Sequence, residues 1–211
     1  MPGVGNAPDA DCELRMATRE LRTSYRPPMS DLWAPLASLP SVASPSGVRA
    51  AVLVPIYEED GRLRVIMTQR PEDMRSHPGD VVFPGGMIEP GDTDPIACAI
   101  REASEEVGLP ARNVVEILGG LSPVHTRSVT MKIVPVVARV ERPAELVPQP
   151  GEVAAIFEPS IDELLDDDAW RTTDWGGRTM WFYEFPDAVL WGATAFMVRD
   201  LLGYFRGASS E

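Results

Sequence analysis

The fold of this chain is decided by the stretch Arg101-Glu102-Ala103-Ser104-Glu105-Glu106-Val107-Gly108-Leu109. In a helix, carboxylates three and four residues apart lie on one face, so Glu102, Glu105 and Glu106 share a side. The opposite side carries apolar residues, namely Ile96, Ile100, Ala103 and Val107. Three like charges on one turn repel each other, and a hard cation such as Mg²⁺ offsets the repulsion because it prefers carboxylate oxygens. The alternative is an acidic face that is simply solvated.

The boundaries of this helix are also marked in the sequence. Asp94 suits an N-cap, Pro95 a first helical residue, and Gly108 a C-terminal stop. Together they predict a helix of about thirteen residues. A strand, a turn at Gly85-Gly86 and a loop are expected before it. Because glycine lacks a side chain, the backbone at Gly86 is able to approach a metal or a phosphate closely.

The segment from Gly86 to Leu109 resembles the signature of the Nudix hydrolases, which cleave diphosphates linked to another moiety. It departs from that signature in two ways. Asp92 stands where a Glu is usual, and one extra residue separates it from Arg101. In both respects the segment resembles the coenzyme A diphosphatase branch of the family, which has an Asp and a slightly longer loop at this place.

An upstream pattern also resembles that branch. The match holds at Thr68, Arg70, Arg75, Gly79 and the run Phe83-Pro84-Gly85-Gly86, whereas Asp80 stands where Gln is common. Further on, the segment Trp191-Gly192-Ala193-Thr194-Ala195 looks like part of the same subfamily. The resemblance extends from about residue 48 to about residue 204.

The resemblance implies metal-dependent hydrolysis of the diphosphate bond of coenzyme A or its derivatives, giving 3′,5′-ADP and 4′-phosphopantetheine. The implied cofactor is Mg²⁺ or Mn²⁺, held by Glu102, Glu105, Glu106 and the carbonyl of Gly86. A general base must lie within hydrogen-bond reach of the attacking water. Glu102, Glu106 and Glu152 are candidates for this base, and the sequence does not choose among them. An ordinary strand-edge carboxylate is the alternative for Glu152.

Three residues are predicted to bind the substrate. Arg70 and Arg75 suit bidentate contacts to phosphates, with a surface ion pair as the alternative for Arg70. His77 lies in a loop whose composition suits substrate contact, with a packed or exposed imidazole as the alternative. Asp80 places a negative charge near an anionic substrate. For that reason ADP-ribose, a dinucleotide or a nucleoside diphosphate sugar remain alternative substrates.

A third hypothesis is a Nudix-fold module that senses a nucleotide without cleaving it. Asp92 and the shifted spacing favour it, whereas the presence of all three glutamates argues against it.

Composition limits the partners and the compartment. The net charge of −13 and pI near 4.6 argue against nucleic acid and against an anionic membrane surface. The expected partner is therefore a small nucleoside diphosphate derivative similar to coenzyme A. Two cysteines, Cys12 and Cys98, give no disulfide framework, and no secretory signal or membrane-length apolar run is visible. We expect a cytoplasmic enzyme, and the sequence leaves open whether it forms a homodimer.

The chain is expected to have three parts. Residues 1–46 form an N-terminal extension that is partly disordered or forms a short helix over 13–24, residues 47–206 form the Nudix domain, and residues 207–211 form a tail. Leu32, Trp33, Leu36 and Leu39 are expected to pack on the main body. Strands are predicted over 48–57, 62–70, 114–119, 131–140, 152–157 and 179–185. Helical segments are predicted over 161–165 and 190–204.

This order of elements predicts an α/β fold in which a mixed sheet lies between helices. The resemblance implies the same architecture, an α/β/α sandwich with a central mixed β-sheet.

Overall fold

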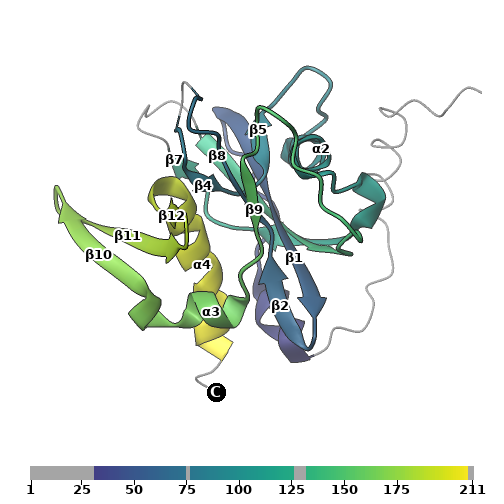
Figure 1. Ribbon diagram of the computed structural model, residues 1–211. Helices are drawn as coiled ribbons and strands as arrows, with labels where there is room; N and C mark the ends of the chain where they lie inside the picture. The colour runs from purple at the N-terminus through teal and green to yellow at the C-terminus, as the bar shows by residue number, and fades with distance from the viewer. Residues whose placement is uncertain (1–30, 75–76, 126–131, 209–211) are drawn as a thin grey trace, which may run out of the picture.

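The computed structural model describes residues 31–74, 77–125 and 132–208 (Figure 1). The short helix expected over 13–24 and the side chain of Arg75 lie outside the described residues. The central sheet has six strands, in which β2, β1, β8 and β6 are neighbours in that order and β5 and β7 pair with β1 and β8. Strands β1 and β8 are parallel and the other pairs are antiparallel, which confirms the mixed sheet. The strands of this sheet are β1 (Val48–Glu59), β2 (Arg62–Val65), β5 (Gly85–Met87), β6 (Val114–Gly120), β7 (Val124–His125) and β8 (Lys132–Val140).

Strand β1 shows why the sheet is covered on both faces. Its side chains alternate between two apolar clusters, so Ala51 and Leu53 point to one face while Val54 and Ile56 point to the other. Residues buried on both faces explain the nearly continuous apolar sequence of this strand. Figure 1 shows helix α2 on one side of the sheet and helix α4 on the other, which confirms the sandwich.

Helix α2 (Pro95–Val107) covers the first face and has the boundaries that the sequence predicts. The Asp94 carboxylate accepts hydrogen bonds from the backbone N–H groups of Ile96 and Ala97 at 2.9 and 3.0 Å. Gly108 ends the helix in the left-handed conformation with φ of 65°. Because the apolar side packs on β1 and β8, the side that carries the glutamates lies against β5.

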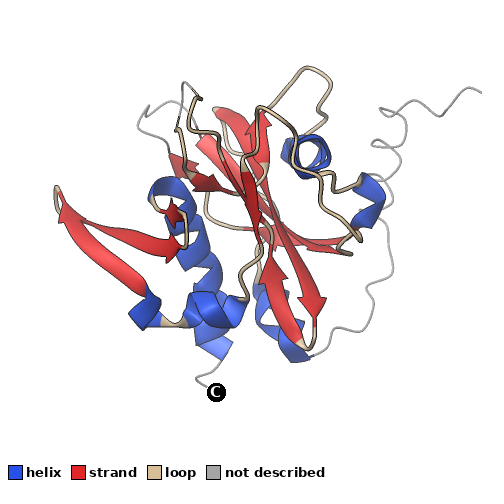
Figure 2. Cartoon of the chain, in the orientation of Figure 1, coloured by secondary structure: helices blue, strands red, loops and turns tan. Residues whose placement is uncertain are grey.

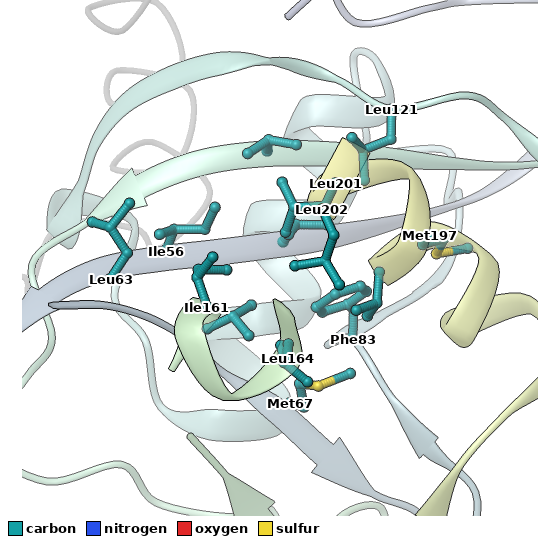
Figure 3. Close-up of a cluster of buried hydrophobic side chains, with 14 of the residues drawn as sticks. Ile56, Leu63, Met67, Phe83, Leu121, Ile161, Leu164, Met197, Leu201 and Leu202 are labelled. Carbon is teal, nitrogen blue, oxygen red and sulfur yellow. The ribbon is translucent and has the colours of Figure 1, made fainter. Parts of the chain in front are cut away.

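Helix α4 (Gly192–Ala208) covers the second face together with the 3₁₀ helix η1 (Asp31–Ser38) and helix α3 (Ile161–Leu165). Figure 3 shows side chains of this cluster, including Phe83, Met197 and Leu201. The predicted packing of Trp33, Leu36 and Leu39 is confirmed, since all three are buried here. The part of the N-terminal extension that the structure describes therefore contributes to the core. The prediction is wrong for Leu32, whose side chain points to solvent and is 38% exposed.

The strand predicted over 62–70 is wrong in one respect, because it divides between two sheets (Figure 2). Strand β2 ends at Val65, where the next position of its partner β1 is Pro55. Proline has no N–H to donate, so the ladder stops there. The chain continues as β3 (Met67–Gln69), which pairs with β4 (Val81–Val82) and β9 (Ala155–Phe157) in a separate sheet.

The turn predicted at Gly85-Gly86 is also wrong. These residues lie in β5 and pair with Val52 and Ala51 of β1. A Cβ atom at Gly85 would lie 2.6 Å from the Cα of Val52, so the two backbones approach too closely for any side chain. Glycine is needed here for the approach of two strands.

A third sheet was not fully foreseen. It contains β10 (Trp170–Trp175), β11 (Arg178–Phe185) and β12 (Ala188–Leu190), of which the sequence predicted only β11. The Arg199 guanidinium of α4 lies 4.0 Å from the ring centroid of Trp181 and 5.4 Å from that of Trp170. These contacts fix the base of the hairpin on α4. Two short 3₁₀ helices, η2 (Ala111–Asn113) and η3 (Asp167–Ala169), complete the described elements.

Candidate active site

The acidic side of α2 lies against β5. A Cβ atom at Gly86 would overlap the carboxylate of Glu102, so the absence of a side chain lets this carboxylate rest on the strand backbone. The carbonyl of Gly86 accepts a hydrogen bond from the Cys98 thiol at 3.7 Å. Burial raises the pKa of this thiol to about 12, with Asp92 and Glu102 adding to the shift, so Cys98 stays protonated. It is a packing residue behind the site.

Arg101 organises the neighbouring carboxylates. Its guanidinium donates to both oxygens of Asp92 at 3.1 and 3.0 Å, to Glu102 at 3.0 Å and to Glu105 at 2.9 Å. The Asp92 side chain is 2% exposed. Burial opposes its ionisation, but the hydrogen bonds from Arg101 outweigh this and lower the pKa of Asp92. Asp92 therefore orients Arg101, although it stands where the family signature has a Glu.

Glu106 is the most buried of the three glutamates, with 6% of its surface exposed. Its carboxylate accepts a hydrogen bond from the Gly85 N–H at 3.0 Å. Burial raises the pKa of Glu106 to about 7, and the charges of Glu102 and Glu152 add to the shift. Burial also raises the pKa of Glu102, which has Glu105 and Glu152 nearby. Both carboxylates are therefore held where a second positive charge would stabilise their ionised forms.

Glu152 reaches this cluster from a different part of the chain. The segment before it is fixed on the C-terminal turn of α2, where Val147 and Gln149 donate backbone hydrogen bonds to the carbonyls of Val107 and Glu106 at 3.0 and 2.8 Å. The short strand predicted to begin at Glu152 is wrong at its start, because β9 begins at Ala155 and Glu152 lies in the preceding turn. The turn leaves the carboxylate exposed and close enough to influence both Glu102 and Glu106.

Arg70 lies directly after β3. Its charge lowers the pKa of Glu106, so a predicted phosphate-binding residue stands beside a predicted metal ligand. His77 is exposed, and its Nδ1 lies 3.0 Å from the Asp80 carboxylate. No contact joins His77 to the glutamates within the described residues.

Sequence reasoning missed the partner of Asp80. The Trp191 Nε1–H donates to the second oxygen of that carboxylate at 2.8 Å, although the two residues are 111 positions apart. The only signal in the sequence was the resemblance of the Trp191-Gly192-Ala193-Thr194-Ala195 segment to the family.

The donor set suits a hard divalent cation in charge and chemistry. Carboxylate oxygens and a carbonyl are the ligands that Mg²⁺ and Mn²⁺ prefer. In the parts of the chain that the structure describes, however, no three His, Cys, Asp or Glu side chains stand in an arrangement that could hold a metal ion. Arg101 forms ion pairs with Glu102 and Glu105, and the N–H of Gly85 donates a hydrogen bond to Glu106. The chemistry of the residues fits a metal, and its ligands are not yet gathered about one point.

Comparisons with known proteins identify the family. The model of the NUDIX domain matches residues 47–176, more than half of the 211-residue chain. The uncharacterized Nudix hydrolase NudL of Photorhabdus laumondii is 34% identical over 166 residues, which cover 77% of this chain and 87% of that protein. The mitochondrial Nudix hydrolase 15 of Arabidopsis thaliana is 35% identical over 173 residues, covering 77% of this chain and 59% of that longer protein.

A solved structure shares the fold. The crystal structure of a MutT/nudix family protein from Enterococcus faecalis matches with a TM-score of 0.50 and 16% sequence identity, covering 98% of this chain and 76% of that one. Among the described residues, no helix is both long and apolar enough to cross a membrane. This chain belongs to the Nudix family, and as one of its hydrolases it acts on the pyrophosphate bond of a nucleoside diphosphate derivative.

Proposed function

We propose that the protein hydrolyses the diphosphate bond of coenzyme A or its derivatives, releasing 3′,5′-ADP and 4′-phosphopantetheine. The observation that carries the proposal is that Glu102, Glu152 and Arg70 all lie near enough to Glu106 for their charges to shift its pKa. Carboxylates and an arginine at one place suit a polyphosphate held between cations. The coenzyme A branch is supported by the sequence pattern around Arg70 and Phe83, with Asp80 as its departure.

Glu102, Glu105, Glu106 and the Gly86 carbonyl would hold Mg²⁺ or Mn²⁺. When bound, such an ion polarises phosphoryl oxygens and lowers the pKa of its water. The raised pKa values of Glu102 and Glu106 support this assignment, because added positive charge would stabilise the ionised forms that burial and the neighbouring carboxylates disfavour. Arg101 would then release Glu102 and Glu105 while it remains fixed by Asp92.

The general base is one of three carboxylates. Glu152 is exposed and lies in a turn near enough to shift the pKa values of Glu102 and Glu106, so it is able to reach a water at the cluster. Glu106 has a pKa of about 7, which suits proton transfer near neutral pH in the metal-free site. Glu102 is the third candidate. We favour Glu152, because metal ligands lose their basicity to the ion they bind.

Arg70 and His77 are the proposed contacts to substrate phosphates, and Arg75 remains a candidate from its sequence position. Arg70 stands beside Glu106, where its guanidinium would contact a phosphate of a substrate held by the metal. We further propose that the enzyme is cytoplasmic.

A substrate panel tests the proposed function. The full chain is incubated with Mg²⁺ or Mn²⁺ and coenzyme A, acetyl-coenzyme A, ADP-ribose, a diadenosine polyphosphate or a nucleoside diphosphate sugar, and products are separated by chromatography. The expected products from coenzyme A are 3′,5′-ADP and 4′-phosphopantetheine. Turnover of another compound without coenzyme A would assign the enzyme to that substrate class.

Single glutamine variants test the roles. Glu105→Gln and Glu106→Gln should each lower kcat/KM by at least about a hundredfold. If both variants hydrolyse the substrate as well as the wild type does, the metal assignment is wrong. If the wild type binds a nucleotide without cleaving any compound, the chain is a sensor. Glu152→Gln should lower kcat by about a hundredfold or more if Glu152 is the base. The matched control is Glu145→Gln, which changes an exposed glutamate earlier in the same segment.

A further inference from the structure

Asp80 joins two parts of the molecule that are distant in sequence. One oxygen accepts from Trp191 Nε1 at 2.8 Å, and the other lies 3.0 Å from His77 Nδ1. The side chain of Asp80 is 18% exposed, whereas that of His77 is 63% exposed. The carboxylate thus lies between a tryptophan at the start of α4 and an imidazole that faces solvent.

The backbone of the same segment couples Asp80 to Arg70. The N–H of Arg70 donates to the carbonyl of Asp80 at 3.0 Å, and the N–H of Gly79 donates to the carbonyl of Arg70 at 3.2 Å. These two bonds continue the β3–β4 pairing, so a displacement of Asp80 carries Arg70 with it. We name the described residues Arg70–Met74 and His77–Asp80 the substrate loop.

The loop is held in a conformation that costs free energy. His77 has a φ of 55°, in the left-handed region that side-chain-bearing residues rarely adopt. Such conformations persist only where the surroundings fix them. The hydrogen bond from Trp191 anchors Asp80 in this loop. The indole is itself held in place, because it stacks on Phe182 with an interplanar angle of 4° and ring centroids 6.3 Å apart.

The contact also orients the imidazole of His77. A carboxylate oxygen accepts hydrogen bonds, so Nδ1 is the donor to Asp80. In the imidazolium form Nε2 is a donor as well and is able to bond a phosphate oxygen. The negative charge of Asp80, which would otherwise repel an anionic substrate, therefore orients the imidazole of His77.

We propose that Asp80, anchored by Trp191, is a positioning residue of the proposed hydrolysis: it holds the substrate loop so that the guanidinium of Arg70 and the Nε2–H of the His77 imidazolium face the substrate's phosphate groups. This inference rests on the proposed function for its substrate. Beyond that function, it connects Trp191, next to the start of α4, with the position of Arg70 beside Glu106. The simpler reading is a structural bond that fastens the loop and has no effect on substrate.

Two conservative variants separate these readings. Asp80→Asn keeps the size of the side chain and an acceptor for Trp191, but it removes the negative charge that pairs with the His77 imidazolium. Trp191→Phe removes the donor and keeps a ring against Phe182. Both should raise KM about tenfold and leave kcat within about twofold, since loop placement affects substrate and transition state alike. The controls are Asp60→Asn at an exposed hairpin turn and Trp175→Phe in the exposed β10–β11 hairpin.

A double variant tests the route through His77. If Asp80 acts by orienting this imidazole, His77→Ala should raise KM in the wild type and add little in the Asp80→Asn background. Additive effects would remove His77 from the proposal. Melting temperatures that fall while KM stays at the wild-type value would show that the bond is structural only.

A binding measurement keeps this test independent of the substrate assignment. Calorimetry with magnesium pyrophosphate should give a dissociation constant about tenfold higher for Asp80→Asn than for Asp60→Asn. If the wild type hydrolyses no compound of the panel, the proposed function fails while this comparison still decides the role of Asp80. Equal dissociation constants for the two variants would overturn the inference.

Discussion

Replacing Glu106 by Gln is expected to stabilise the metal-free protein at pH 8 and to remove its activity. Burial and neighbouring carboxylates raise the pKa of Glu106 from 4.5 to about 7. The folded protein therefore retains a proton that the unfolded chain has already released, so the free energy of unfolding falls as pH rises from about 4.5 to about 7. At about 1.4 kcal/mol per pH unit, the loss amounts to about 3 kcal/mol.

Glutamine does not ionise, and its side-chain oxygen can still accept the hydrogen bond from the Gly85 N–H. The variant should consequently match the wild type at pH 5 to within about 1 kcal/mol and exceed it by about 3 kcal/mol at pH 8. For a chain of this length the difference corresponds to a melting temperature about 6–12 °C higher.

The assay is urea denaturation in EDTA at a series of pH values, for the wild type, Glu106→Gln and Glu105→Gln. Glu105→Gln is the control, because the Glu105 side chain is 56% exposed in its ion pair with Arg101 and should change stability by less than about 1 kcal/mol. Adding Mg²⁺ should stabilise the wild type by mass action and stabilise Glu106→Gln much less. A difference between wild type and Glu106→Gln that does not vary with pH would refute the reasoning.

Three further predictions concern the strand contact, the core and an ion pair. Gly86→Ala should lower kcat/KM about a hundredfold in steady-state assays by displacing Glu102; Gly91→Ala, with open space around it, should not. Trp33→Ala should cost about 3–5 kcal/mol in urea denaturation, because this indole is 1% exposed. Burial opposes ionisation of Glu158, but hydrogen bonds from Arg142 and Tyr57 outweigh it and lower its pKa. Its stabilisation is therefore present above pH 4.5 and lost in acid, so Glu158→Gln should cost about 1–3 kcal/mol at pH 7. A loss of the same size at pH 3 would contradict the ion-pair explanation.

The sequence alone determined helix α2 and the acidic side that it presents. Asp94, Pro95 and Gly108 act on residues within one helical turn, so their effects are readable without knowledge of the fold. The burial of Trp33 and Leu36 was also predictable, because a large apolar side chain beside an apolar sheet has few other places to go. The position of Glu102, Glu105 and Glu106 on one side of the helix was predictable as well, because residues three and four apart share a helical face.

Tertiary structure decided what lies opposite that helix. The division of the 62–70 strand depends on Pro55, a residue of the partner strand, and Gly85 lies in a strand because Val52 approaches it from β1. Glu152 lies near the site because the segment before it donates backbone hydrogen bonds to the last carbonyls of α2. Asp80 accepts a hydrogen bond from Trp191, which is 111 residues away in the sequence. Local sequence specifies local backbone geometry. Contacts between distant segments depend on how whole elements pack, and no short pattern encodes them.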